Sequence, residues 1–412
     1  MMSEKMRKEI LKRVKKVSFK KNPCFYIYDL NKITSQIGFL QKNMPQNVDL
    51  FYSIKANPHD RIIKHINSHS YIKGVEIASL GDLNNALKIF HPQQVIFTGP
   101  GKTPYAIRMA IKKKIGYFVV ESYLEALRIQ KVAEEEKVKS VNIFIRINID
   151  FKASLTYSAS KLSSTQLMSG LSTKFGIDEC NANSLFVAVG KLDRLVVQGI
   201  HVMTASEQLN YRHLLTYFKH VFQLVKKLSN KNLNIQIIDF GGGFGIDYEG
   251  KNKELDIILL GKGFNHLIKK YGFEKRILIF ELGKYLVGES GYYVTEIIDI
   301  KESRGKKHII TAGGINHNIR PLLAGIHYSV SVISLHRPKL YSNQISVTGE
   351  KVDIGGPLSS SLDTFFKDML ITEAHVGDLF VIHHSGAYSL TLSPVNFISH
   401  PIPKEYFTSF NN

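Results

Sequence analysis

The amino-acid sequence predicts an α/β protein that combines a (β/α)8 TIM-type barrel with a C-terminal all-β domain. The chain has 412 residues, which is too many for one ordinary α/β domain and enough for two. Short apolar runs alternate with amphipathic stretches between residues 48 and 282. After about residue 290 the pattern changes to short β-type runs separated by turns rich in Gly, Pro, Ser and Asn.

Eight apolar runs are candidates for the barrel strands, and each is typical of a strand buried on both faces of a parallel sheet. They are Val48–Ile54, Gly74–Ala78, Gln94–Thr98, Gly116–Val120, Val141–Asn148, Val196–Met203, Asn234–Phe240 and Ile277–Leu282. Amphipathic stretches lie between several of them, at Asp60–Ser68, Leu80–Phe90, Ser122–Glu136 and Tyr211–Leu228. The alternation matches a (β/α)8 barrel, although the pattern alone also fits an open, doubly wound sheet.

The all-β domain is predicted to use both parts of the chain that flank the barrel. Its strand candidates after the barrel are Gly291–Ile300, His308–Thr311, Gln344–Asp353 and Leu379–His383. Cys24–Tyr28 forms a further strand candidate before the barrel, and its natural place is the same β domain. We therefore expect an N-terminal helix and strand in residues 1–35, a barrel in 36–287 and the β domain in 288–412.

The charge of the protein is strongly positive but does not by itself identify a partner. Lys and Arg number 54 against 35 Asp and Glu, a net charge of +19, and residues 1–22 hold nine of the basic residues and two of the acidic ones. Met6, Ile10, Val14 and Val17 recur at helical spacing, which predicts an amphipathic helix with a basic face. Such a face could attract a phosphate backbone or an anionic membrane. A helix that packs on the protein through its apolar stripe is the better explanation, because no nucleic-acid-binding motif accompanies the charge.

Other features favour a cytoplasmic protein that uses no metal. No apolar run approaches the roughly 20 residues that span a bilayer, and the first residues lack the apolar core of a signal peptide. Cys24 and Cys180 are too few for a disulfide scaffold. His383 and His384 are adjacent on a predicted strand and would point to opposite faces, so they do not form a metal pair.

Residues that could bind a cofactor or take part in a reaction lie where three of the predicted barrel strands end. The strand ends are the usual place for the active site of a barrel. Lys55 follows the first strand; alone it fits a structural ion pair, but a desolvated lysine can also attack a carbonyl. Asp239 is followed by Gly241–Gly243, whose backbone N–H groups could approach a phosphate. Glu281 lies in the eighth strand, where burial requires a cationic or N–H partner. A lysine, a glycine-rich turn and a carboxylate are the parts that a pyridoxal-phosphate site requires.

The chain resembles the fold-type III pyridoxal-phosphate decarboxylases, the family of diaminopimelate, ornithine and arginine decarboxylases, which is related in fold to alanine racemase. The resemblance extends from Phe25 to Pro401. It is carried in family order by the blocks FYSIKANP, GVEIASLGDL, RIN, KFGI, GIHVMTASEQ, DFGGGFG, FELGKYLVGESG, GGINHNIRP, GGPLSSSLD and GAYSLTLSP.

The resemblance implies a role for each matching residue. Lys55 would bind pyridoxal 5'-phosphate covalently, and Glu281 would hold the pyridine nitrogen protonated. Contacts to the cofactor phosphate are implied for Ser206, Gly241, Gly242, Gly243 and Tyr388, and Gly283 would also border the cofactor. Arg146 would line the pocket, and Arg320 would meet a substrate carboxylate.

Several departures from the family pattern bear on the substrate. Met203 occupies the position of the histidine that stacks on the cofactor ring, and His201 could compensate. Lys284 replaces the arginine that binds the phosphate. A guanidinium group can make a bidentate contact, whereas an ammonium group acts as a point charge. Ser359 replaces the cysteine that returns a proton to the product, and Ser360 replaces the acidic residue that binds the distal amine of diamine substrates. Without that carboxylate, diaminopimelate, ornithine and lysine would lose a contact.

These departures are most similar to the branch that serves siderophore and antibiotic biosynthesis. We therefore expect a decarboxylase of an amino acid, or of an amino-acid conjugate of an anionic acid, that acts as a head-to-tail homodimer. Ser359, Ser360, Asp363 and Tyr388 would complete the site of the partner subunit. Diaminopimelate decarboxylation, a catalytically impaired homologue and a nucleic-acid-associated barrel protein are the alternatives.

Overall fold

The computed structural model describes residues 2–150, 172–203, 206–230, 233–251, 254–335 and 344–410. The chain divides into two compact units. The barrel unit comprises Thr34–Ile246 and Glu254–Leu286, and the β unit comprises Met1–Ile33, Asp247–Lys253 and Val287–Asn412. No helix among the described residues is both long enough and apolar enough to span a membrane.

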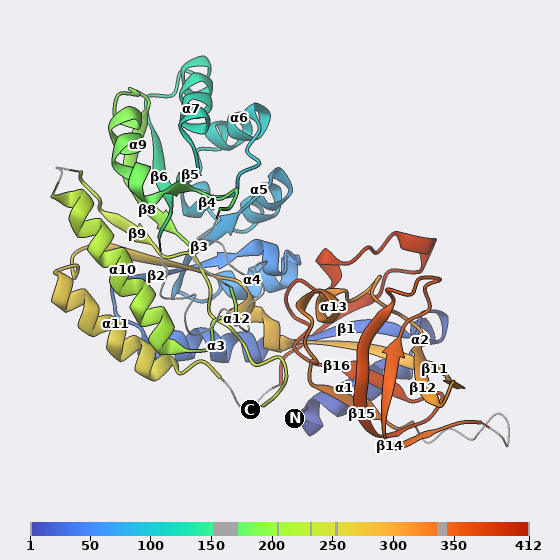
Figure 1. Cartoon of the computed structure of the whole chain (residues 1–412). Coiled ribbons are helices and arrows are strands. Elements are labelled where there is room, and N and C mark those ends of the chain that lie inside the picture. The colour runs from blue at the N-terminus through green and yellow to red at the C-terminus, as the bar shows by residue number, and fades with distance from the viewer. Residues whose placement is uncertain are drawn as a thin grey trace. The chain divides into compact units, whose positions relative to one another are not determined.

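The barrel unit contains a closed barrel of eight parallel strands (Figure 1). The strands are β2 (Val48–Ser53), β3 (Ile72–Ile77), β4 (Val95–Phe97), β5 (Tyr117–Val120), β6 (Val141–Asn148), β8 (Leu195–Val202), β9 (Ile237–Asp239) and β10 (Ile277–Leu282). Pairing of β10 with β2 closes the barrel, with Leu278 opposite Val48 and Leu282 opposite Tyr52. The short β7 (Ile177–Asp178) pairs only with the end of β6. The predicted barrel is confirmed, and the open, doubly wound sheet is excluded.

The barrel interior is filled by side chains from most of its strands. A buried cluster takes one residue from each of six strands, as the layered packing of such barrels requires. Its members are Phe51, Ile96, Val119, Phe144, Ile237 and Ile279. The strands also approach one another closely at Gly199 on β8, where a Cβ atom would lie 2.0 Å from the Ile237 carbonyl oxygen. Only glycine fits at this position.

Helices surround the barrel, and several of them begin at recognisable capping residues. They are α3 (Leu30–Asn43), α4 (Asp60–Asn67), α5 (Leu80–Leu87), α6 (Pro104–Lys112), α7 (Tyr123–Glu135), α9 (Ala182–Val189), α10 (Tyr211–Ser229), α11 (Ile257–Tyr271) and the short α12 (Lys284–Val287). Ser79, Thr103 and Ser122 accept hydrogen bonds from backbone N–H groups in the first turns of α5, α6 and α7, which is the usual N-cap arrangement. These caps fix where each helix leaves the loop that follows a barrel strand.

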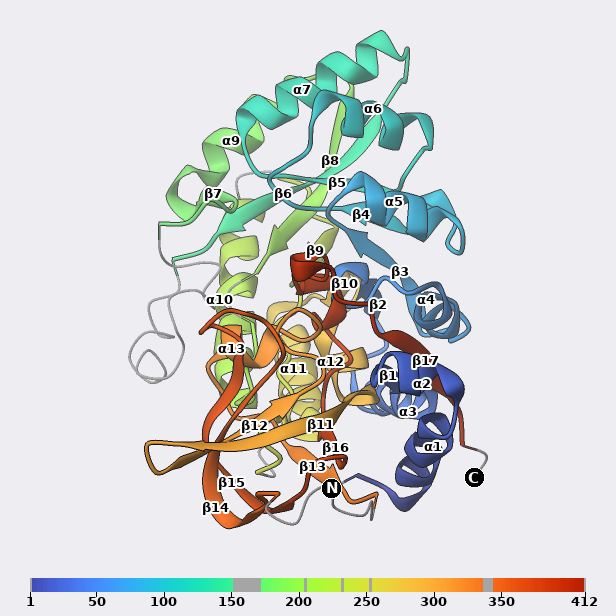
Figure 2. The same ribbon diagram turned by 90° about the vertical axis from the view of Figure 1, so that its right-hand side faces the viewer.

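The β unit is built around a bent sheet in which both flanking parts of the chain take part (Figure 2). Its strands are β1 (Cys24–Asp29), β11 (Gly291–Ser303), β12 (Lys306–Thr311), β13 (Val330–Ile333), β14 (Val347–Gly355), β15 (Thr364–Ala374), β16 (Leu379–Ile382) and β17 (Lys404–Thr408), with the short helix α13 (Arg320–Ala324). The order is β13-β16-β11-β12-β14-β15, and β1 pairs with β11 and β17. Cys24–Tyr28, predicted as a strand of the β domain, lies in β1 of this sheet.

The predicted amphipathic helix at the start of the chain forms two pieces, α1 (Glu4–Val14) and α2 (Val17–Lys21). Met6, Ile10 and Phe19 are buried in one cluster with Phe25 of β1. The guanidinium carbon of Arg13 lies 4.9 Å from the centre of the Tyr406 ring, which packs against the same cluster. The apolar stripe therefore packs on the β unit, as the sequence favoured. The side chain of Val17 lies outside the described residues.

Candidate active site

Lys55 and Glu76 form an ion pair where β2 and β3 end. Lys55 lies in the short 3-10 turn Ile54–Ala56 that follows β2, and its Nζ is 2.9 Å from both carboxylate oxygens of Glu76. Glu76 is fully buried and also accepts hydrogen bonds from the hydroxyls of Ser53 and Thr98. Burial would raise the pKa of Glu76, but the Lys55 charge and these hydrogen bonds outweigh it and lower the pKa. The expectation that Lys55 requires a partner is met by Glu76.

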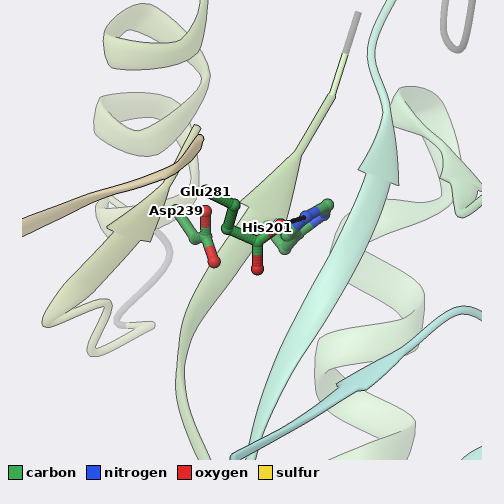
Figure 3. A group of neighbouring side chains, drawn as sticks. All are labelled: His201, Asp239 and Glu281. Atoms are coloured by element: carbon green, nitrogen blue, oxygen red, sulfur yellow. Dashed lines mark hydrogen bonds and ion pairs between the residues drawn. The ribbon is translucent and has the colours of Figure 1, made fainter. Parts of the chain in front are cut away.

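A second group of buried side chains comes from β8, β9 and β10 (Figure 3). His201 Nε2 is 3.3 Å from Glu281 Oε2, and the nearest ligand atoms of His201, Asp239 and Glu281 all lie within 4.8 Å of one another. Burial raises the pKa of Asp239 well above its usual value, and the neighbouring Glu281 charge raises it further. Burial therefore favours the neutral form of Asp239, and the His201 ring nitrogen is a polar partner of Glu281.

The same three side chains match the ligand types of a divalent metal ion. Among the described residues no side chain other than the neighbouring Asp239 carboxyl interacts with Glu281 Oε1. A buried carboxylate oxygen of this kind can accept an N–H group of a bound ligand.

The glycine-rich turn after β9 lies beside Met203. Gly241 and Gly243 have φ values of +62° and +105°, and a Cβ atom on Gly241 would lie 2.8 Å from Met203 Sδ. The Gly241 N–H donates to Asp239 Oδ1 at 2.8 Å, and the Gly242 N–H donates to Met203 Sδ at 3.2 Å. Two of the three N–H groups expected at a phosphate thus have partners within the protein.

Two further buried ion pairs involve expected site residues. Arg146 on β6 contacts Glu121 through an Nη1–Oε1 distance of 3.0 Å, with the Phe175 ring 4.5 Å from its guanidinium carbon. Lys284, at the start of α12, forms an ion pair with Glu207. Sequence reasoning missed Glu76, Glu121 and Glu207 as members of this region. Glu76 could have been found, because it is an acid inside an apolar strand, which is the same signal that identified Glu281.

Two small expected residues frame the region around Lys284. Gly283 leaves no room for a side chain, because its Cβ atom would lie 2.8 Å from Ala56 Cβ. Ser206 is half-buried and directly precedes Glu207.

In the β unit, Asp363 connects two glycine-containing loops. Its Oδ1 accepts the Ile315 N–H and its Oδ2 accepts the Leu358 N–H, both at 2.7 Å. Burial raises the pKa of Asp363, although these N–H groups oppose the shift. Ser359 next to this loop is exposed, and Ser360 is half-buried and accepts the Leu362 N–H at 3.3 Å.

Tyr388 and Arg320 lie together elsewhere in the β unit. The Arg320 guanidinium carbon is 5.8 Å from the centre of the Tyr388 ring. Tyr388 has a φ of +55°, a conformation that is uncommon for a bulky residue and that often marks a functional position.

A closed (β/α)8 barrel with a lysine, a glycine-rich turn and a buried carboxylate at its strand ends defines a class of protein, the barrel enzymes that depend on pyridoxal phosphate. Comparison with known proteins agrees. Residues 30–288 match the family model "Pyridoxal-dependent decarboxylase, pyridoxal binding domain", and the chain belongs to this family.

Curated relatives and solved structures match most of the chain. A 2-[(L-alanin-3-ylcarbamoyl)methyl]-2-hydroxybutanedioate decarboxylase from Staphylococcus aureus is 29% identical over 92% of this chain and 93% of its own length. An L-glutamyl-[BtrI acyl-carrier protein] decarboxylase from Niallia circulans is 30% identical over 92% of this chain and 87% of its own. The crystal structure of diaminopimelate decarboxylase from Helicobacter pylori in complex with L-lysine has a TM-score of 0.83 and 26% identity, and it covers 97% of this chain and 93% of that one.

These matches confirm the predicted family, fold, cofactor and enzyme class. The protein is a decarboxylase that uses pyridoxal phosphate. The residues described above also fit that cofactor: Lys55 offers an amine, Glu281 Oε1 can accept an N–H, and the glycine-rich turn presents backbone where side chains would clash with the protein.

Proposed function

We propose that the enzyme decarboxylates an amino acid that is joined to a larger acidic group, rather than a free diamino acid. One observation carries this proposal. In the segment 356–363, the single carboxylate belongs to Asp363, and both of its oxygens accept backbone N–H groups. The neighbouring Ser359 and Ser360 are neutral, so this segment offers no carboxylate to a distal ammonium group. An ammonium group desolvated without a partner binds poorly.

The names of two relatives support the same substrate class. One acts on an alanine unit attached to a hydroxybutanedioate, and the other acts on a glutamyl group carried by an acyl-carrier protein. In both, the amino acid is part of a conjugate. The net charge of +19 would favour the approach of an anionic conjugate. Siderophore or other specialised-metabolite biosynthesis is the process that we propose for such a reaction.

In the proposed site, Lys55 binds the cofactor covalently and Glu281 faces its pyridine nitrogen. Bound pyridoxal phosphate supplies an electron sink for the electrons of the broken Cα–carboxylate bond. The Lys55 amine must lose its proton before it can react with a carbonyl, and the Glu76 carboxylate, 2.9 Å away, holds that amine in position at the end of β2. Glu281, buried beside Asp239, is the carboxylate that would keep the pyridine nitrogen protonated.

The remaining expected residues receive binding roles. Ser206, the glycine-rich turn and Lys284 are assigned to the phosphate, with Tyr388 of the β unit. His201 and Met203 are assigned to the ring, with Arg146 as a pocket residue. Ser359 is assigned to the return of a proton to Cα, and Arg320, Ser360 and Asp363 to the substrate region.

Substrate choice is tested by measuring CO2 release from a panel of compounds. The panel contains the alanine–hydroxybutanedioate conjugate, a glutamyl thioester, free L-glutamate and meso-diaminopimelate. We expect turnover of a conjugate and little turnover of meso-diaminopimelate. Preferred turnover of meso-diaminopimelate would refute the proposal and favour lysine biosynthesis. A protein that binds the cofactor but turns over none of them would be a catalytically impaired homologue.

We further propose that the enzyme is a homodimer whose subunits share residues at each active site. The β unit exposes large apolar side chains such as Leu362, at 66%, and Phe397, at 49%, which a partner surface could cover. The K55A and Y388A variants should each be inactive, and mixing them should restore partial activity if Lys55 and Tyr388 act across subunits. Sedimentation that shows only monomers would refute the dimer.

We also propose that the protein is cytoplasmic. Cys24 is buried and Cys180 is exposed, and neither forms a disulfide, which fits a reducing compartment. Cell fractionation tests this location, and recovery of the protein outside the cytoplasm would refute it.

A further inference from the structure

The ion pair between Lys284 and Glu207 is nearly enclosed by protein. The Lys284 side chain is 9% exposed and the Glu207 side chain is 10% exposed, and Lys284 Nζ donates to Glu207 Oε1. Forming an ion pair away from water costs desolvation free energy that the attraction repays only with good geometry. A pair of this kind beside a binding site is therefore expected to influence whatever charged ligand enters the site.

Backbone hydrogen bonds connect both partners to the glycine-rich turn. On the Glu207 side, the Gln208 N–H donates to the Gly243 carbonyl at 2.9 Å and the Gly245 N–H donates to the Gln208 carbonyl at 3.0 Å. On the Lys284 side, the Glu281 N–H donates to the Gly241 carbonyl at 2.8 Å. The ion pair thus lies between two segments that both border the turn.

The conformation of Glu207 is also unusual. Its φ is +68°, in the left-handed region that costs a residue other than glycine free energy. A Cβ atom on Gly245 would lie 2.8 Å from the Glu207 carbonyl carbon, so the backbone on both sides packs tightly. The fold therefore fixes where the Glu207 carboxylate can lie.

We propose that Glu207 is a positioning residue that competes with the cofactor phosphate for the Lys284 ammonium group and so weakens phosphate binding. The proposal rests on the assignment of Lys284 and the glycine-rich turn to the phosphate. An ammonium group is a point charge with rotatable donors, so its attraction is divided between a carboxylate and a phosphate. A fixed carboxylate near a phosphate also repels it, because the two charges have the same sign.

The test compares two cofactor forms that differ only in the phosphate. Apoenzyme of the wild type and of Glu207→Gln is titrated with pyridoxal 5'-phosphate and with pyridoxal, and the visible absorbance of the lysine-bound ligand reports Kd. We expect Glu207→Gln to lower the Kd of pyridoxal phosphate by on the order of tenfold, the effect of one partly screened charge. The Kd of pyridoxal should not change.

Two further variants isolate the effect. Glu135→Gln removes one negative charge from the exposed ion pair with Arg108 on the outer helices, and it should leave both Kd values unchanged. Lys284→Met should weaken binding of pyridoxal phosphate alone. In a protein that already carries Lys284→Met, adding Glu207→Gln should no longer tighten the binding of pyridoxal phosphate through the lysine. The effects of the two substitutions on the binding free energy should therefore not be additive.

Inorganic phosphate gives a readout that requires no reaction with Lys55. Phosphate should raise the Tm of the apoenzyme more in Glu207→Gln than in the wild type, because ligand binding stabilises the folded state according to affinity. If Glu207→Gln does not fold, Glu207→Asp serves for the same comparison, because its side chain is one methylene shorter and moves the carboxylate away from Lys284.

The outcomes separate this proposal from the proposed function. Weaker or unchanged binding of pyridoxal phosphate in Glu207→Gln, or an equal change for pyridoxal, would overturn the role of Glu207. A wild-type protein that gains no visible absorbance with either ligand would instead refute the assignment of Lys55, and with it the basis of both proposals.

Discussion

The substitution Asp239→Asn should change how the stability of the protein depends on pH. Asp239 is fully buried, and its pKa is raised well above 3.8 by burial and by the Glu281 charge. Asparagine has nearly the same shape and is always neutral. Its oxygen can accept the Gly241 N–H that Asp239 accepts at 2.8 Å, and its NH2 group can face Glu281 in place of the acid proton.

The expected magnitude follows from proton linkage. The folded protein retains the Asp239 proton at pH values where the unfolded chain has released it. The stability that comes from this proton is complete below pH 3.8 and is lost as the pH rises toward the folded-state pKa. One proton bound only in the folded state lowers the free energy of unfolding by about 1.4 kcal/mol per pH unit. Over the pH range in which the folded protein keeps this proton, the wild type should therefore lose stability, at up to that rate, that Asp239→Asn does not lose.

Urea denaturation of the cofactor-free protein at pH 5, 6 and 7, followed by circular dichroism, measures this difference. Other groups contribute equally to both proteins, so the difference in slope between them isolates Asp239. Asp193→Asn, at a side chain that is 71% exposed, is the control and should follow the wild type. Parallel pH dependences for Asp239→Asn and the wild type would show that Asp239 is ionised in the folded protein.

Three further predictions concern the cofactor site and the β unit. Lys55→Ala should abolish the visible absorbance of bound cofactor, and its retention at wild-type intensity would exclude Lys55 as the attachment point. Glu281→Gln should retain that absorbance but lower kcat by roughly a hundredfold or more, because it removes electrostatic stabilisation of the reacting group; an unchanged kcat measured by CO2 release would contradict the role. Ile10→Ala, at a fully buried position of α1, should lower the free energy of unfolding by about 2–4 kcal/mol, and a loss below about 0.5 kcal/mol would show that the helix does not pack on the β unit.

The sequence predicted the barrel well because parallel barrel strands are buried on both faces. Runs such as Val141–Asn148 are nearly continuous in apolar residues, and that run forms β6 with the same bounds. The β unit was harder to predict. β15 alternates buried and exposed residues and contains Lys367 and Asp368, so it has no continuous apolar run, and β13 and β17 are only four and five residues long.

For the candidate site, the sequence indicated which residues carry charge but not which residues pair. Lys55 and Glu281 stood out because each is charged within or next to an apolar strand. Their partners depend on how strands close the barrel, since Glu76 reaches Lys55 from the neighbouring β3 and His201 reaches Glu281 from β8. Nothing in the sequence marked Glu207, because its importance comes from a backbone conformation and an ion pair that only the fold creates.

The position of β1 has a consequence for the order in which the chain can acquire structure during synthesis. β1 lies between β11, which pairs Tyr26 with Tyr293, and β17, which pairs Tyr26 with Glu405. The strand therefore leaves the ribosome long before either of its partners exists. All eight barrel strands have been synthesised once Leu282 has been added to the chain. The barrel unit can therefore form while β1 and the two N-terminal helices still lack their partner strands. The β unit is completed only when the last strand emerges, and ribosome-bound chains that end before residue 404 should hold an unpaired edge of β1.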